Sequence, residues 1–170
     1  VVTAIRENWT SSDPLRKDAA MQAWTALVGT DATWDFKVDI RRTEWYKKGT
    51  RDVWLGSRLL NYDAVANLHF GSVGRAAGFS GDFLVQAAGF AQLKRFLLDT
   101  GNPDDLGSLS CYFDHPYATY FIEFGIYLYN EYGDRLDQLD NIAFTLALEA
   151  YIWEHGKPPD PPPGAEAQKQ

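Results

Sequence analysis

Two segments of the sequence combine residue types that acid–base chemistry uses. The first runs from Asn67 to Gly78 and holds His69, one of only three histidines, together with three glycines. The second is Asp114-His115. A histidine oriented by a carboxylate is a common general base. We therefore predict that His69, Asp114 and His115 are catalytic, and that Asp114 pairs with His69, because adjacent side chains seldom hydrogen-bond each other usefully.

Each of these assignments has a structural alternative. Asp114 can cap a helix that opens at the following proline, which would leave His115 merely exposed. His69 can be a buried imidazole with satisfied polar atoms. Glu149 stands at helical spacing from apolar neighbours, which predicts that it faces the interior, where a carboxyl group has a raised pKa and can act as a general acid. The alternative is a helix rotated so that Glu149 faces water.

The glycines between Asn67 and Gly78 predict tight backbone turns, because glycine is a poor former of helices and strands. Their spacing matches neither a phosphate-binding loop nor the dinucleotide fingerprint. A single cysteine and three scattered histidines disfavour a structural zinc site. We expect neither a metal nor a cofactor.

Composition limits the classes of partner. Acidic residues outnumber basic ones 23 to 16, for a net charge of −7. Nucleic-acid-binding proteins usually carry a basic field, so this charge disfavours an extended nucleic-acid interface, although several basic residues cluster between Arg41 and Arg58. The chain has no apolar run of the length that spans a bilayer, so we expect no membrane insertion. The lone Cys111 excludes an intrachain disulfide.

Hydrophobic spacing predicts an α+β fold that is mainly helical, with four or so helices around a core and a small β hairpin near residues 33–60. The helices are expected at 15–28, 82–98, 117–132 and 137–155, with a short helix beginning near Asn61 and strands at 33–46 and 51–60. The expected buried faces include Phe90 and Leu97 on one helix, and Leu146 and Trp153 on the last. Residues 1–156 form the predicted single domain, and 157–170 a proline-rich flexible tail.

Four stretches together resemble the polymorphic toxin type 44 family: Trp34 to Lys37, Asn67 to Phe79, Phe83 to Gln92 and Asp114 to Tyr117. Members are C-terminal toxin domains of secreted or contact-dependent bacterial effectors. The resemblance, over residues 33–130, implies delivery into the cytoplasm or periplasm of a target bacterium. It also implies a parent delivery protein and a cognate immunity protein as partners. Departures from the family pattern at Phe70, His115 and Ala118 disfavour an acidic metal site near residue 114.

Three functions fit these features. The first is a metal-independent, RNase-type nuclease in which His69, Asp114 and His115 act as acid and base. The second is a muramidase-like peptidoglycan hydrolase that uses Asp114 or Glu149 as its acid. The third is a non-enzymatic interaction module. For the nuclease, Lys37 or Arg75 would hold a phosphate; the full set of predicted substrate-binding residues is Asp35, Lys37, Asn67, Gly71 and Arg75.

Overall fold

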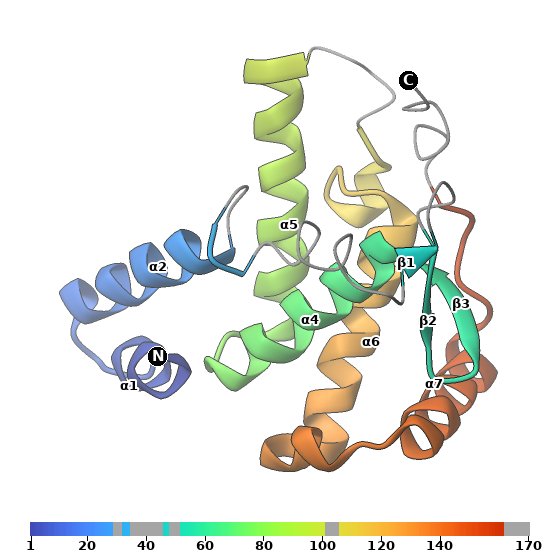
Figure 1. The fold of residues 1–170 in the computed structure, drawn as a ribbon. Helices are drawn as coiled ribbons and strands as arrows, with labels where there is room; N and C mark the ends of the chain where they lie inside the picture. Colours follow the sequence, from blue (N-terminus) through green and yellow to red (C-terminus); the bar gives the residue numbers. More distant parts are fainter. Residues whose placement is uncertain (29–31, 35–45, 48–51, 101–105, 162–170) are drawn as a thin grey trace.

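The fold is seen in a computed structural model that describes residues 1–28, 32–34, 46–47, 52–100 and 106–161 (Figure 1). These residues form six α-helices and a three-stranded antiparallel sheet, which confirms the mainly helical α+β prediction. The elements are α1 (Val2–Trp9), α2 (Pro14–Val28), β1 (Tyr46–Lys47), β2 (Asp52–Leu55), β3 (Arg58–Asn61), α4 (Tyr62–Ala76), α5 (Gly81–Arg95), α6 (Pro116–Tyr132) and α7 (Asn141–His155). A π-helical turn (Phe96–Thr100) extends α5, and short 3-10 helices occupy Leu109–Cys111 and Gly133–Gln138.

Helix starts follow the capping residues in the sequence. The Asn61 side chain accepts a hydrogen bond from the Asp63 N–H at the start of α4. Ser80 caps α5 in the same way, and Asp140 caps α7. These side chains satisfy N–H groups that a helix cannot pair within itself. The predicted helix start near Asn61 is therefore confirmed.

The glycine stretch is a helix rather than a series of turns. Residues up to Ala76 continue α4, and only Gly78, after its end, has a positive φ, of 90°. A Cβ atom at Gly71 would overlap the carbonyl oxygen of Ile122, and one at Gly125 would overlap that of Leu68. The glycines thus let the backbones of α4 and α6 touch where the helices cross (Figure 1). This contact outweighs the helix-forming penalty of glycine that favoured turns.

The other side of α6 packs through aromatic rings. Phe124 lies 5.0 Å from Tyr151 and 5.8 Å from Phe144, measured between ring centroids, and both partners belong to α7. A second cluster joins α1, α2 and α5 around the fully buried Phe79, whose ring lies 4.6 Å from Trp9. Helix α6 therefore stands between a backbone contact with α4 and a side-chain contact with α7.

The exposed faces of two helices differ from the prediction. On α7, Leu146 is 64% exposed and Trp153 is 92% exposed, whereas the opposite face is buried. Phe90 on α5 and Leu97 in the π-helical turn after it are exposed, while the buried residues of α5 are Leu84, Val85 and Gly89. The predicted buried faces were wrong because both helices carry apolar residues on more than one side, and spacing alone then does not select the inward one.

The sheet is built mainly from one hairpin. Strands β2 and β3 pair antiparallel around Gly56-Ser57, and Gly56 has the positive φ of 61° that favours glycine in such a turn. The predicted second strand, 51–60, is thus itself a hairpin. Strand β1 pairs with β2, placing Tyr46 opposite Val53. Most of the predicted first strand lies outside the described residues.

Candidate functional site

His69 lies in the middle of α4 with its ring edge-on to Trp34, at a centroid separation of 6.1 Å. Burial of the half-buried ring lowers the pKa of His69 from 6.5 to about 4, because desolvation disfavours the charged form. The imidazole is therefore neutral at physiological pH. A neutral imidazole can accept a proton.

The direction of His69 follows from the position of Gly71. Gly71 touches α6, and successive residues turn by about 100° around an α-helix, so His69 leaves α4 about 160° away from that contact. Its ring thus meets Trp34 on a different side of the helix from α6. The pairing of His69 with Asp114, which immediately precedes α6, stays a prediction.

Asp114 and His115 form the start of α6 together. The Nδ1 atom of His115 accepts the backbone N–H of Tyr117 at 3.2 Å, so His115, rather than Asp114, caps the helix. The Asp114 carboxylate accepts the backbone N–H of His115 at 2.8 Å. Because Nδ1 is the acceptor, a neutral His115 carries its hydrogen on Nε2. Partial burial also lowers the pKa of His115.

The turn before Asp114 has an unusual backbone. Tyr112 and Phe113 have φ angles of 52° and 73°, in the left-handed region that L-residues rarely adopt. The turn is closed by the Gly107 N–H, which donates to the Phe113 carbonyl at 2.9 Å. Asp114 itself is buried. Such strain is found at positions that the surrounding structure holds firmly, and functional sites are frequent among them.

A pocket of about 330 Å³ opens beside the first turn of α6. Tyr117 lines it, two residues after His115, whereas neither His69 nor His115 does. Its polar lining residues are Asp52, Arg58, Asn61, Tyr117 and Asp160. Burial raises the pKa of Tyr117 to about 12, a hydrogen bond with the Asn61 backbone lowers it, and the charges of Asp63 and Asp52 raise it further. The Tyr117 hydroxyl therefore stays protonated at physiological pH.

Comparison with known families settles the affiliation. The sequence pattern of the family described as bacterial toxin 44 matches residues 23–131, more than half of the chain. The chain belongs to the bacterial toxin 44 family. The match confirms the resemblance and identifies a toxin domain. No curated protein and no solved structure matches the chain significantly. The matched range includes α4 and α5 but ends before α7.

The other predicted site residues of this toxin domain have different surroundings. Asn67 is half-buried on α4, and Gly71 is covered by α6. The Arg75 guanidinium donates to Asn130 Oδ1 at 3.3 Å and to the Phe79 carbonyl. Asp35 and Lys37 lie outside the described residues. The structure thus groups Asp114 with His115 and places Asn67, His69, Gly71 and Arg75 along one helix.

Glu149 does not occupy the interior position that helical spacing predicted. It accepts a hydrogen bond from Arg58 Nε at 2.7 Å on the exposed side of α7. The helix is rotated relative to the prediction because Phe144, Leu148 and Tyr151 form its buried face. Glu149 is therefore an exposed ion-pair residue of α7.

Sequence reasoning missed the pocket beside Tyr117. Asn61 was recognised only as a possible helix cap. Tyr117 was recognised only as part of an aromatic helix and of the Asp114 to Tyr117 stretch that resembles the toxin family. The signal that was available is a polar residue, Asn61, at the end of a strand directly before a helix, where chain direction changes. Within the described ranges, no group of three or more His, Cys, Asp or Glu side chains is placed to hold a metal ion. No helix in the described part of the chain is long and apolar enough to cross a membrane.

Proposed function

We propose that this domain is an antibacterial effector toxin that cleaves RNA without a metal, with His69 as the general base. Its parent protein would deliver it into a target bacterium, and a cognate immunity protein would neutralise it in the producer. The observation that carries the assignment is the half-buried His69 ring, neutral at physiological pH, on a helix that lies wholly within the family match.

The reaction needs little beyond positioned proton carriers and a cation. The base removes the proton of a ribose 2′-OH, whose oxygen attacks the neighbouring phosphorus. The 5′-oxygen then leaves with a proton from an acid, and a 2′,3′-cyclic phosphate remains. In the proposal His69 is the base. His115 is the acid, and it donates its Nε2 proton from the protonated, imidazolium form; substrate would have to bring both to the same phosphate. Asp114 fixes the backbone of His115.

A cation must stabilise the phosphate in the transition state. With a pKa of about 4, His69 is a weak base, so this contribution matters more than it would for an ordinary histidine. Lys37 stands three residues after Trp34 in the sequence. Trp34 touches His69. We assign Lys37 the phosphate-binding role, since the Arg75 guanidinium already binds Asn130 and Phe79.

The test is cleavage of total RNA by the purified domain in the presence of a chelator. His69→Asn should lower the rate by at least about 100-fold, the usual contribution of a general base. His155→Asn is the matched control, because His155 is exposed at the end of α7, outside the family match. RNA that stays intact with the unaltered domain, or equal rates for the two variants, would contradict the proposal.

A glycan hydrolase of the cell wall is the second candidate. The pocket beside Tyr117 favours it, because two carboxylates, Asp52 and Asp160, line that pocket and glycosidases work with paired carboxylates. The two functions act in different compartments. A nuclease should kill from the cytoplasm, whereas a glycan hydrolase should be toxic only after export to the periplasm. Equal killing from cytoplasmic expression would exclude the second candidate.

A further inference from the structure

The pocket beside α6 is assembled from four separate parts of the chain. The β2–β3 hairpin contributes one wall, and α6 contributes Tyr117 and Phe121. Helix α7 provides Leu148 and Ile152, and the segment from Pro158 to Pro161 closes the remaining side. Its volume of about 330 Å³ lies at the lower end of the range for small-ligand sites. The pocket therefore has room for about one ring of a ligand.

The polar side chains that line the pocket include both hydrogen-bond donors and hydrogen-bond acceptors. A carboxylate such as Asp160 only accepts hydrogen bonds, and a guanidinium such as Arg58 only donates them. The Asn61 side-chain oxygen already accepts from Asp63, which leaves its amide hydrogens. The Tyr117 hydroxyl can both donate and accept. A ligand that uses this set must itself present donors and acceptors on neighbouring atoms, as hydroxyl groups do.

The charges around the pocket disfavour an anionic ligand. The Arg58 guanidinium is held by Glu149, with Nε 2.7 Å from the carboxylate oxygen. Asp52 and Asp160 line the pocket, and the charges of Asp52 and Asp63 both raise the pKa of the Tyr117 hydroxyl. A phosphate group placed here would meet carboxylates rather than an uncompensated cation. These charges therefore favour a neutral ligand over an anionic one.

The remaining lining is apolar. Leu60, Phe121, Leu148 and Ile152 lie among the lining residues, together with three prolines of the closing segment. A sugar ring has apolar C–H faces and a rim of hydroxyls, so it matches a lining that combines apolar and polar side chains. We infer that this pocket binds a single neutral, hydroxylated sugar ring. The inference concerns ligand binding and does not depend on the cleavage reaction proposed above.

Half of this site lies outside the family match. Helix α7 and Pro158–Pro161 follow the last matched residue, 131, whereas the hairpin and Tyr117 precede it. The Tyr120 hydroxyl donates a hydrogen bond to the Gly156 carbonyl at 2.7 Å. This bond holds the chain just before the segment from Pro158 to Pro161. The walls that the family pattern does not cover therefore decide which substituents on the sugar ring this chain accepts.

The test is binding of phosphate-free sugars to the whole chain, measured by calorimetry and ligand-observed NMR. Uridine and adenosine represent the ribose of RNA, and the trimer of N-acetylglucosamine represents a cell-wall glycan. At least one arm should bind. Tyr117→Phe and Asp160→Asn should each weaken binding about tenfold, the effect of losing one hydrogen bond of about 1.4 kcal/mol.

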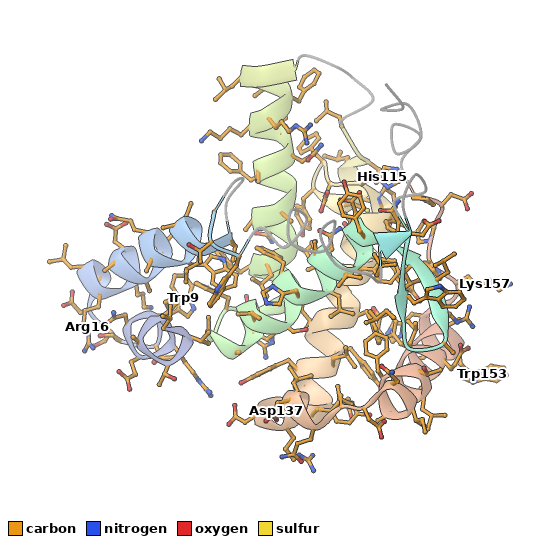
Figure 2. All side chains as sticks on the ribbon, viewed as in Figure 1. Trp9, Arg16, His115, Asp137, Trp153 and Lys157 are labelled. Atoms are coloured by element: carbon orange, nitrogen blue, oxygen red, sulfur yellow. The ribbon has the colours of Figure 1, made fainter. Side chains whose placement is uncertain are left out.

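Two matched controls complete the design. Tyr127→Phe removes a hydroxyl from the same helix, α6, but outside the pocket. Asp137→Asn removes an exposed acid that follows the C-terminal end of α6, whereas His115 lies at its N-terminal end (Figure 2). Both should leave binding unchanged. Binding weaker than about 10 mM for every sugar, or equal binding by Tyr117→Phe and the unaltered chain, would overturn the inference. His69→Asn should bind sugars normally, which separates this result from failure of the cleavage proposal.

Discussion

The two sides of α6 are packed in different ways. Toward α4 the contact is backbone on backbone, because Gly71 and Gly125 leave no side chain between the helices. Toward α7 the gap is filled by rings, with Phe124 against Phe144 and Tyr151. A glycine contact has one geometry and no side chain that can adjust, whereas aromatic side chains can shift and repack. The difference predicts a rigid α4–α6 unit and a more tolerant attachment of α7.

The glycine side should be the more sensitive to substitution. Gly71→Ala or Gly125→Ala would force a methyl group into a carbonyl of the facing helix, and we expect a loss of more than about 4 kcal/mol of unfolding free energy. Gly81→Ala is the control, because its Cβ would meet Ile126 at an ordinary 3.6 Å. Chemical denaturation measures all three. A loss of stability at Gly71 no larger than at Gly81 would remove the distinction between the two sides.

The aromatic side should respond less, through a cavity that neighbouring rings partly fill. Phe144→Ala is expected to cost about 3 kcal/mol. Phe90→Ala removes the same side chain from an exposed position on α5 and should change stability by less than about 0.5 kcal/mol. Urea unfolding curves give both values. If Phe144→Ala prevented folding altogether, the attachment of α7 would be as rigid as the crossing.

Lowering the pH tests how His69 in α4 contributes to the free energy of unfolding, without a substitution in the packing of the helix. His69 has a folded-state pKa lowered to about 4 against 6.5 in the unfolded chain, so the unfolded chain binds the proton more readily. The stabilising contribution of neutral His69 is thus complete above pH 6.5 and is lost as the pH falls toward 4, by on the order of 2 kcal/mol. His69→Gln should flatten this slope relative to His155→Gln, in stability measured from pH 7 to 4.

The outer face of α7 should matter least for folding. Trp153 is 92% exposed, and Figure 2 shows it at the edge of the molecule, pointing away from the body. Trp153→Ser is therefore expected to change the free energy of unfolding by less than about 0.5 kcal/mol. A clear loss of stability in the isolated domain would show that this tryptophan packs against part of the chain and that α7 is held from both sides.

The sequence predicted what local chemistry decides. Helix starts at Asn61 and Ser80 follow from side chains that bond the next N–H groups. Gly71 in α4 was misread because its role depends on Ile122, 51 residues later, and no local rule reveals such a contact. The buried face of α7 was predicted wrongly for a related reason. Its apolar residues lie on two faces, so contact with the partner helix decides which face is buried.

The candidate site shows the same limit. His115 was correctly placed at a helix start, but which of Asp114 and His115 caps the helix depends on the left-handed turn before them. That turn is not a glycine turn, so its residues gave no signal. The pocket beside Tyr117 could not be predicted because its walls come from segments up to about 100 residues apart.

The turn at Tyr112 and Phe113 bears on which mutations this domain can accept during evolution. An L-residue in the left-handed region costs about 1 kcal/mol relative to glycine, so a glycine at either position would make the fold more durable. The same glycine would give the loop more conformations and leave the adjoining Asp114 less firmly placed. At these two residues, a mutation to glycine that stabilises the fold therefore also makes the position of the Asp114 carboxylate less fixed.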